Sequence, residues 1–169
     1  MSRSRLNSPF AVNPPNHPGR LPSRLDWLIA LGALWTSPNT LLGLLIGSFG
    51  LIGGARFVLR RGEYAIVFTH WPWGKGGALT LGNCILHTGP SLDTSCALYA
   101  PVAGCSPGLT PRLADHERAH VFQYMVLGPM FLPVYLACGG ISARNVFERA
   151  ADRYALTARG WWPSIRTRS

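Results

Sequence analysis

Residues 110–128, TPRLADHERAHVFQYMVLG, decide the fold because they have the pattern of one complete helix with its own start and stop signals. Thr110 suits the N-cap, and Pro111 suits the first helical position, where its missing N–H would be unpaired in any case. Gly128 followed by a proline is a common end to a helix. The sequence therefore predicts a helix between Thr110 and Gly128, with an HExxH pattern near its middle.

That pattern is His116-Glu117-x-x-His120. The two histidines are four residues apart, so they lie on one face of the helix, about 6 Å apart along its axis, and both imidazoles can reach one ion. Glu117 is rotated away from the pair, where it can act as a general base on a zinc-bound water. The pattern predicts Zn2+ as cofactor, His116 and His120 as its ligands, and Glu117 as the catalytic base.

The third ligand is predicted on a second helix, which by its cap residues runs from Ser142 to Gly160. The chain has only three glutamates; one lies in the HExxH pattern, and another, Glu148, lies on this second helix. Two histidines and one glutamate leave the fourth zinc position open for water, as a catalytic site requires. Asp152 follows one turn later, and a carboxylate there can accept the far N–H of a ligand histidine.

The combination of HExxH with a later Glu148-x-x-x-Asp152 resembles the gluzincin zinc peptidases, the class of thermolysin. Residues 147–155, FERAADRYA, are similar to the corresponding helix of the HtpX and CAAX-type membrane metallopeptidases. The resemblance implies the same roles: His116, His120 and Glu148 as zinc ligands, Glu117 as the base, and Asp152 as the partner of a ligand histidine.

A second resemblance covers more of the chain. Residues 116–135, with Leu79-Thr-Leu-Gly82 upstream, are similar to a family of small bacterial membrane-associated proteins, over a region from about Thr36 to Ala155. This likeness implies little chemistry beyond the zinc motif.

These residues together predict a membrane-associated zinc metallopeptidase that hydrolyses a peptide or protein substrate. Tyr154 and His87 are candidates to stabilise the developing oxyanion, although each is more often structural. The alternative is a non-catalytic membrane protein with a structural or degenerate zinc site, because the chain is small and shows no definite oxyanion donor. In a third hypothesis the motif is accidental, and the protein is a basic binder of membranes or nucleic acid.

The composition indicates the kind of partner. Hydrophobic residues make up 47% of the 169 residues and charged residues only 14%. Soluble proteins usually have about 25% charged residues, so the deficit indicates contact with a membrane. The net charge of +9 suits anionic lipid or nucleic acid. Because no nucleic-acid-binding module is recognisable, membrane lipid is the expected partner and nucleic acid is not.

Changes of composition divide the chain into four predicted regions. The first is a flexible tail rich in arginine and proline. The second is an uncharged hydrophobic region, the third is a zincin-like catalytic domain, and the fourth is a short aromatic and basic tail. Their bounds are 1–24, 25–59, 60–160 and 161–169.

The hydrophobic region has no charged residue between Trp27 and Ala55. Turn chemistry at residues 36–40 divides it into a short and a long helical arm, and the long arm is predicted to continue to Leu59. A helical hairpin that dips into the membrane and one kinked span both fit, and a buried hairpin in a soluble core is the alternative. Arginines flank both ends, which favours the hairpin and a cytoplasmic active site.

The remaining elements are predicted from local patterns. Gly43 and Gly47 on the long arm permit close contact with another helix. β-Branched and aromatic runs at 63–69 and 77–86 predict a β-hairpin or small antiparallel sheet, and the second run suits either an extended substrate peptide or an ordinary core position. Two prolines predict a kinked helix at 130–138.

The predicted fold class is therefore α+β and mainly helical. A membrane-associated helical hairpin and a small antiparallel sheet precede the HExxH helix, and a C-terminal helix with the third ligand completes a zincin-like site. Four cysteines contain no C-x-x-C pair, and a disulfide between Cys96 and Cys105 is one option.

Overall fold

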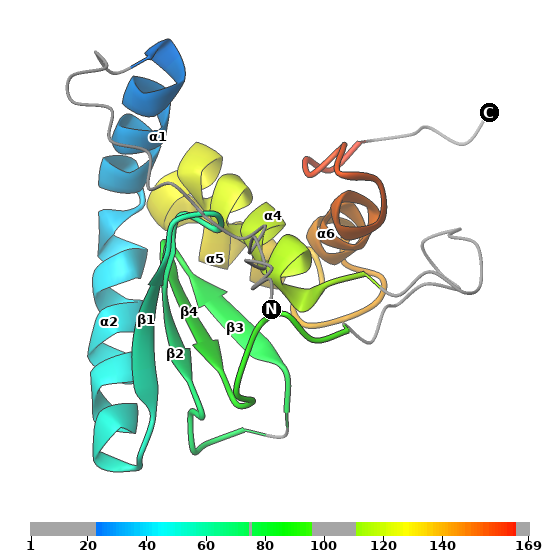
Figure 1. Cartoon of the computed structure of the whole chain (residues 1–169). Coiled ribbons are helices and arrows are strands. Elements are labelled where there is room, and N and C mark those ends of the chain that lie inside the picture. The colour runs from blue at the N-terminus through cyan, green and yellow to red at the C-terminus, as the bar shows by residue number, and fades with distance from the viewer. Residues whose placement is uncertain (1–22, 75, 96–110, 165–169) are drawn as a thin grey trace, which may run out of the picture.

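A computed structural model describes residues 23–74, 76–95 and 111–164 (Figure 1). The fold is α+β, and about half of the described residues are helical. The elements are α1 (Arg24–Trp35), α2 (Ser37–Ile52), β1 (Arg56–Arg60), β2 (Ala65–Thr69), β3 (Ala78–Leu81), β4 (Cys84–His87), α4 (Leu113–Leu127), the 3-10 turn η1 (Gly128–Met130), α5 (Phe131–Ala137) and α6 (Val146–Thr157). The predicted flexible tail, apart from its last two residues, and the pair Cys96 and Cys105 lie outside the described residues.

The four strands form one mixed sheet in the order β1-β2-β4-β3. β1 and β3 pair antiparallel with their neighbours, whereas β2 and β4 run parallel, with Ile66 opposite Cys84. The predicted antiparallel sheet is therefore wrong in its central pair. The run at 77–86 folds back on itself at Gly82 and Asn83, because Gly82 has a φ of +62° that suits a tight two-residue turn, and it forms two strands instead of one.

The long helical arm ends at Ile52, earlier than predicted. Two glycines follow, and Gly54 has a φ of +93°, which no helix allows. The predicted continuation to Leu59 is wrong, since Arg56–Arg60 is strand β1, paired with β2. Aromatic and branched side chains in this segment favour a strand once the glycines have stopped the helix.

The two predicted arms are present as α1 and α2, which meet at Thr36 with a bend of 67°. This bend is intermediate between a straight span and an antiparallel hairpin. By length and composition alone, one described helix, Leu113–Ala137 counted through η1, is suited to cross a membrane, and α1 with α2 passes the same test if the bent pair is taken as one span. The core helix of a soluble protein meets the same criterion.

Glycines on α2 pack against the sheet. A Cβ atom on Gly43 would lie 2.7 Å from the Cβ of Cys84, and one on Gly47 would lie 2.4 Å from the ring of Phe68. The side-chain amide of Asn39 on the same helix donates to the Gly128 carbonyl at 2.9 Å. The predicted small face therefore contacts strands rather than another helix, and α2 shares its core with the sheet.

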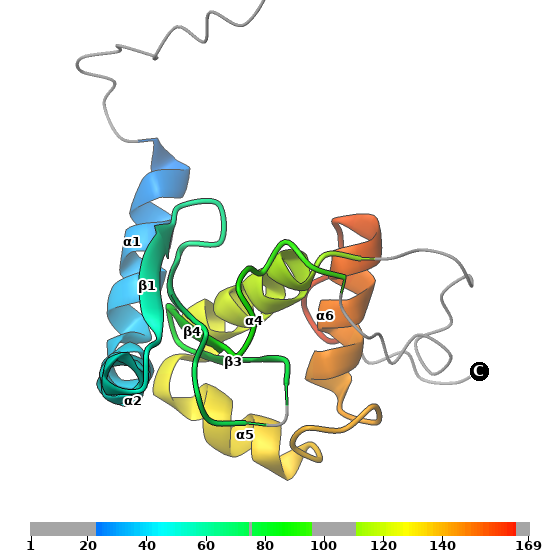
Figure 2. The same ribbon diagram turned by 60° about the horizontal axis from the view of Figure 1, so that its bottom comes forward.

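Helix α4 lies between the sheet and α6 in both views (Figures 1 and 2). Its side toward the sheet meets the buried side chains of Val67 and Ile85 through Val121. A second buried group joins Tyr124 of α4 to the aromatic side chains of α5 and α6. Because both sides of α4 are packed, the backbone around HExxH is held by the core.

The bounds of the two predicted site helices need correction. α4 begins at Leu113, later than predicted, and the predicted N-cap Thr110 lies outside the described residues. α6 is shorter than the predicted Ser142–Gly160, because its N-cap is Asn145, whose side chain accepts a hydrogen bond from the Phe147 N–H. A helix is present in the segment predicted at 130–138, as α5, and η1 directly precedes it.

Candidate metal centre

The HExxH helix and the last helix bring three metal-binding side chains together. His116 and His120 project from α4, and Glu148 projects from the first turn of α6. Their ligand atoms lie within 4.8 Å of one another, and all three residues are buried. The three predicted ligands thus meet at one point, with His116 Nε2 3.2 Å from His120 Nε2.

The two remaining edges of this group involve the Glu148 carboxylate. One oxygen lies 3.2 Å from His116 Nε2, and the other lies 3.5 Å from His120 Nε2. Ligands bound to zinc at about 2.0–2.1 Å in a tetrahedron are separated by about 3.3 Å. Each imidazole faces a different oxygen of the carboxylate, and every separation is close to that of neighbouring zinc ligands, so the residues suit this ion in both chemistry and spacing.

Asp152 fixes one of the two imidazoles. Its Oδ1 lies 3.0 Å from His116 Nδ1, and the aspartate is fully buried. An ionised carboxylate can only accept, so the Nδ1 of His116 carries the proton and its Nε2 presents a lone pair. This is the role predicted for Asp152 from its position one turn after Glu148.

Gln123 fixes the other imidazole and was missed by the sequence analysis. Its Oε1 lies 2.8 Å from His120 Nδ1, while its amide nitrogen donates to the carbonyls of Phe147 and Trp161 at 3.2 and 2.8 Å. Because the amide nitrogen faces two acceptors, the oxygen must face His120, and His120 Nδ1 must be the donor. A signal was present, since Gln123 follows His120 by three residues on the same helix.

Both Nε2 lone pairs consequently point toward one carboxylate. Burial raises the pKa of Glu148, but hydrogen bonds from the imidazoles of His116 and His120, which require a proton on Nε2, outweigh this effect and hold that pKa well below its usual range. An ionised carboxylate and two lone pairs at these distances repel one another unless a cation or a proton lies among them. The arrangement thus requires positive charge at its centre.

Glu117 lies beside this group without belonging to it. Its carboxylate is buried, and its Oε2 accepts a hydrogen bond from the Thr80 hydroxyl at 2.6 Å. Thr80 belongs to β3, so the sheet positions the predicted base from the side opposite to its own helix. The nearby Tyr124 hydroxyl has a raised pKa, mainly because it is buried and secondly because of the charge of Glu117, so it stays protonated.

A pocket of about 260 Å³ opens onto the three predicted ligands and Glu117. One wall is β3 with the segment before it, and another is α5. β3 is at one edge of the sheet, so the run at 77–86 brings a strand edge next to the site. Only the first half of this run lines the pocket. Apolar side chains such as Leu79 and Phe131 contribute to the lining.

Tyr135 is a further side chain of the site that the sequence analysis missed. Its hydroxyl donates to Oε1 of Glu148, and the residue lines the pocket. The contact depends on α5 folding back toward α6 after η1, and no local sequence pattern reports such a contact.

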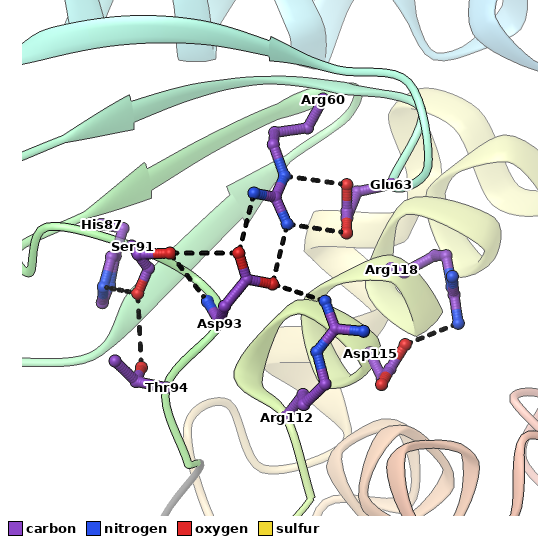
Figure 3. A network of polar contacts seen from close by, with 9 residues as sticks. All are labelled: Arg60, Glu63, His87, Ser91, Asp93, Thr94, Arg112, Asp115 and Arg118. Atoms are coloured by element: carbon purple, nitrogen blue, oxygen red, sulfur yellow. Dashed lines mark hydrogen bonds and ion pairs between the residues drawn. The ribbon is translucent and has the colours of Figure 1, made fainter. Parts of the chain in front are cut away.

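The two residues predicted as oxyanion stabilisers do not line the pocket. Tyr154 packs edge-on against Phe122, and Arg118 lies over its ring. His87 is buried, with Nδ1 2.9 Å from the Gly77 carbonyl and Nε2 3.0 Å from the Ser91 carbonyl (Figure 3). Tyr154 therefore packs against α4, and His87 contacts backbone carbonyls. Neither side chain is in contact with the three predicted ligands.

Comparison with known proteins gives no relative from which a function can be transferred. No protein-family profile matches the chain, and neither characterised proteins nor solved structures gave a match. The argument for function therefore depends on this chain's own residues.

Proposed function

We propose that this protein is a zinc metallopeptidase in which His116, His120 and Glu148 hold the ion. The observation that carries the proposal is that one ligand atom from each of these three buried residues lies within 4.8 Å of the other two, with the two Nε2 atoms 3.2 Å apart. Zinc, when bound, supplies Lewis acidity that lowers the pKa of a water molecule to about 7 and polarises a carbonyl.

Glu117 is the proposed general base. It lines the pocket next to the ligands, and the Thr80 hydroxyl holds one carboxylate oxygen, which leaves Oε1 to take up a proton from the attacking water. The same oxygen can then give the proton to the leaving amine. A residue that moves protons in this way must not be a ligand, and Glu117 lies outside the three-residue group.

Strand β3 is the proposed site for the substrate backbone. It is an edge strand that lines the pocket, so its outer side can pair with an extended peptide as a further strand. Tyr135 is proposed to orient Glu148 through its hydroxyl hydrogen bond. Tyr154 and His87 are not part of the proposal as oxyanion stabilisers, because neither of those side chains lines the pocket.

The alternative is a structural zinc site without catalysis. Structural zinc sites usually have four protein ligands. Among the described histidines, cysteines, aspartates and glutamates, only three residues form a group of this kind, and a pocket lies beside it. This observation favours the catalytic reading over the structural one.

The test combines metal analysis with hydrolysis of an unfolded protein substrate. Purified wild type should contain about one zinc per chain, and His116→Ala should lose it. Glu117→Gln should retain zinc and hydrolyse about 10²–10⁴-fold more slowly, because only the proton acceptor is lost. Glu63→Gln is the matched control, since Glu63 is a buried glutamate that pairs with Arg60 outside the site.

Two results would contradict the proposal. A metal-free protein whose stability does not respond to zinc would remove the metal centre itself. Full zinc content with equal hydrolysis by wild type and Glu117→Gln would remove the catalytic role of Glu117. Zinc without hydrolysis by wild type would favour the structural alternative.

A further inference from the structure

An apolar surface covers one side of the molecule, away from the pocket. It is formed by the helices α1 and α2 together with β1, the edge strand of the sheet that lies nearest to them in the view (Figure 1). We call it the α1–α2–β1 face and define it by its exposed side chains Leu28, Leu34, Leu45, Phe49, Ile52 and Phe57. Ile52 is 86% exposed and Leu34 is 70% exposed, values far from those of core residues.

We propose that the α1–α2–β1 face seats the protein on an anionic lipid bilayer, with α1 and α2 lying in the membrane surface rather than crossing it. This inference is independent of peptide hydrolysis.

The fold does not use these side chains for its own core. α1 has no buried residue, and the buried positions of α2 are Asn39, which contacts η1, and three glycines, which contact the sheet or Trp71. Leu44 and Ile46 of α2 pack partly against the core, but Leu45, Phe49 and Ile52 point outward. So many large apolar side chains left exposed on neighbouring elements mark an interaction site.

Charge identifies the occupant as anionic. Between residues 23 and 61 the chain has four arginines and one acidic residue, Asp26. Asp26 is engaged in the cap of α1 by Ser23. Within the described residues, Arg24, Arg56 and Arg61 form no ion pair, so their guanidinium groups suit lipid headgroups.

Tryptophans border the same face. Trp27 and Trp35 of α1 are 61% and 54% exposed, and Trp73, which stacks edge-on against Trp71, is 51% exposed. Gly50 near the end of α2 contacts the ring of Trp71, so this pair lies beside the other end of the face. Tryptophan is enriched where a membrane meets water, because its ring is apolar and its N–H is polar.

The geometry favours lying in the surface over spanning. At 1.5 Å per residue, α1 is about 18 Å long and α2 about 24 Å, each shorter than the hydrocarbon core of about 30 Å. They are bent by 67°. α2 is also fixed to the sheet and to η1, by the Asn39 bond to Gly128 and by Thr40, which accepts from the Asn83 N–H at 2.9 Å.

Only one side of α2 can therefore face lipid. The pocket lies beside β3, at the opposite edge of the sheet from β1, and is left in the aqueous phase. A second copy of the chain fits the face less well, because a symmetric dimer would bring unpaired arginines of the same kind together.

The test is vesicle flotation of the purified full chain. Vesicles of phosphatidylcholine with about one third phosphatidylglycerol should bind the protein, and pure phosphatidylcholine should bind it less. Leu45→Glu should weaken binding at least tenfold, roughly the value of one inserted leucine. Arg56→Gln with Arg61→Gln should weaken binding to anionic vesicles by about fivefold per arginine.

Leu136→Glu is the matched control, because Leu136 on α5 is as exposed as Leu45, at 61% against 59%, but lies outside the face. It should bind as wild type does. Alkaline carbonate should release the bound protein, since it does not cross the bilayer. Circular dichroism and zinc content of each variant show whether the fold and the metal centre are intact.

Four results would overturn the proposal: no binding to anionic vesicles, equal binding by Leu45→Glu and Leu136→Glu, resistance to carbonate as for a spanning protein, or a dimer in solution that Leu45→Glu dissociates without any vesicle binding. Loss of zinc or of hydrolysis would leave vesicle binding unchanged, so the two proposals fail separately.

Discussion

Two clusters of polar side chains in this structure differ in whether they contain their own positive charge. One joins β1, the loop before α4 and the start of α4 through Arg60, Glu63, Asp93 and Arg112 (Figure 3). It has two cations and two anions, and the Asp93 side chain is 46% exposed. The other cluster is the buried group of His116, His120, Glu148 and Asp152.

The difference shows what each cluster needs. In the first cluster every carboxylate meets a guanidinium, and its Asp93 end is exposed to water that screens the charges there, so the cluster is complete as it stands. In the buried cluster two carboxylates meet two imidazoles whose Nδ1 protons point outward, to Asp152 and Gln123. Its centre has one donor, the Tyr135 hydroxyl, and no cationic side chain to match the guanidinium groups of the first cluster, and burial makes an uncompensated charge there expensive. The comparison therefore predicts that a metal ion stabilises the fold through the buried cluster and not through the first cluster.

The largest expected effect is stabilisation by zinc. Zinc at about 1,000 times its dissociation constant should stabilise wild type by about 4 kcal/mol, because it binds the folded chain. His120→Ala should lose this response, since one of three ligands is gone. Asp93→Asn should retain it in full. Thermal unfolding with and without chelator measures all three, and an equal zinc response in His120→Ala would break the comparison.

A smaller effect is expected from the partner of a ligand. Asp152→Asn keeps the shape of the side chain but removes the charge that holds the His116 Nδ1 proton. Loss of such a partner typically weakens metal binding 10–100-fold, or about 1.4–2.7 kcal/mol. Competition with a zinc-binding dye measures the affinity. The same change at Asp93 is the control, and equal losses at the two aspartates would show that Asp152 has no particular role.

The sequence predicted which side chains of the candidate metal centre come together better than it predicted the sheet, for a physical reason. His116, His120, Glu148 and Asp152 are spaced by one helical turn within each helix, so local periodicity alone brings each pair to one face. Gln123 had the same signal, three residues after His120, and was overlooked. Tyr135 had none, because its contact with Glu148 depends on how α5 folds back.

The errors in the sheet come from pairings that are distant in sequence. The parallel pair β2 and β4 is joined through β3, and two adjacent apolar runs look like a simple hairpin when read locally. The sequence predicts a helix where β1 lies, because the apolar residues of β1 continue the apolar run of α2. The decisive signal was the glycine pair after Ile52, which stops the helix.

The smallest expected effect comes from the first cluster. Arg60 and Arg112 hold the pKa of Asp93 well below its usual range by hydrogen bonds, with Arg60 the larger cause. A depressed folded-state pKa adds stability above the unfolded value of about 3.9, and this contribution is lost as pH falls below it. Because the aspartate is nearly half exposed, Asp93→Asn should cost less than about 1 kcal/mol at pH 7.

The difference between wild type and Asp93→Asn should shrink below about pH 4 and in high salt, where the charge of Asp93 is neutralised or screened. Urea unfolding from pH 3 to pH 7 measures it. A loss of several kcal/mol, insensitive to salt, would mean that water does not screen this cluster. The contrast with the buried cluster would then depend on the arginines of the first cluster alone and not on the burial of the second.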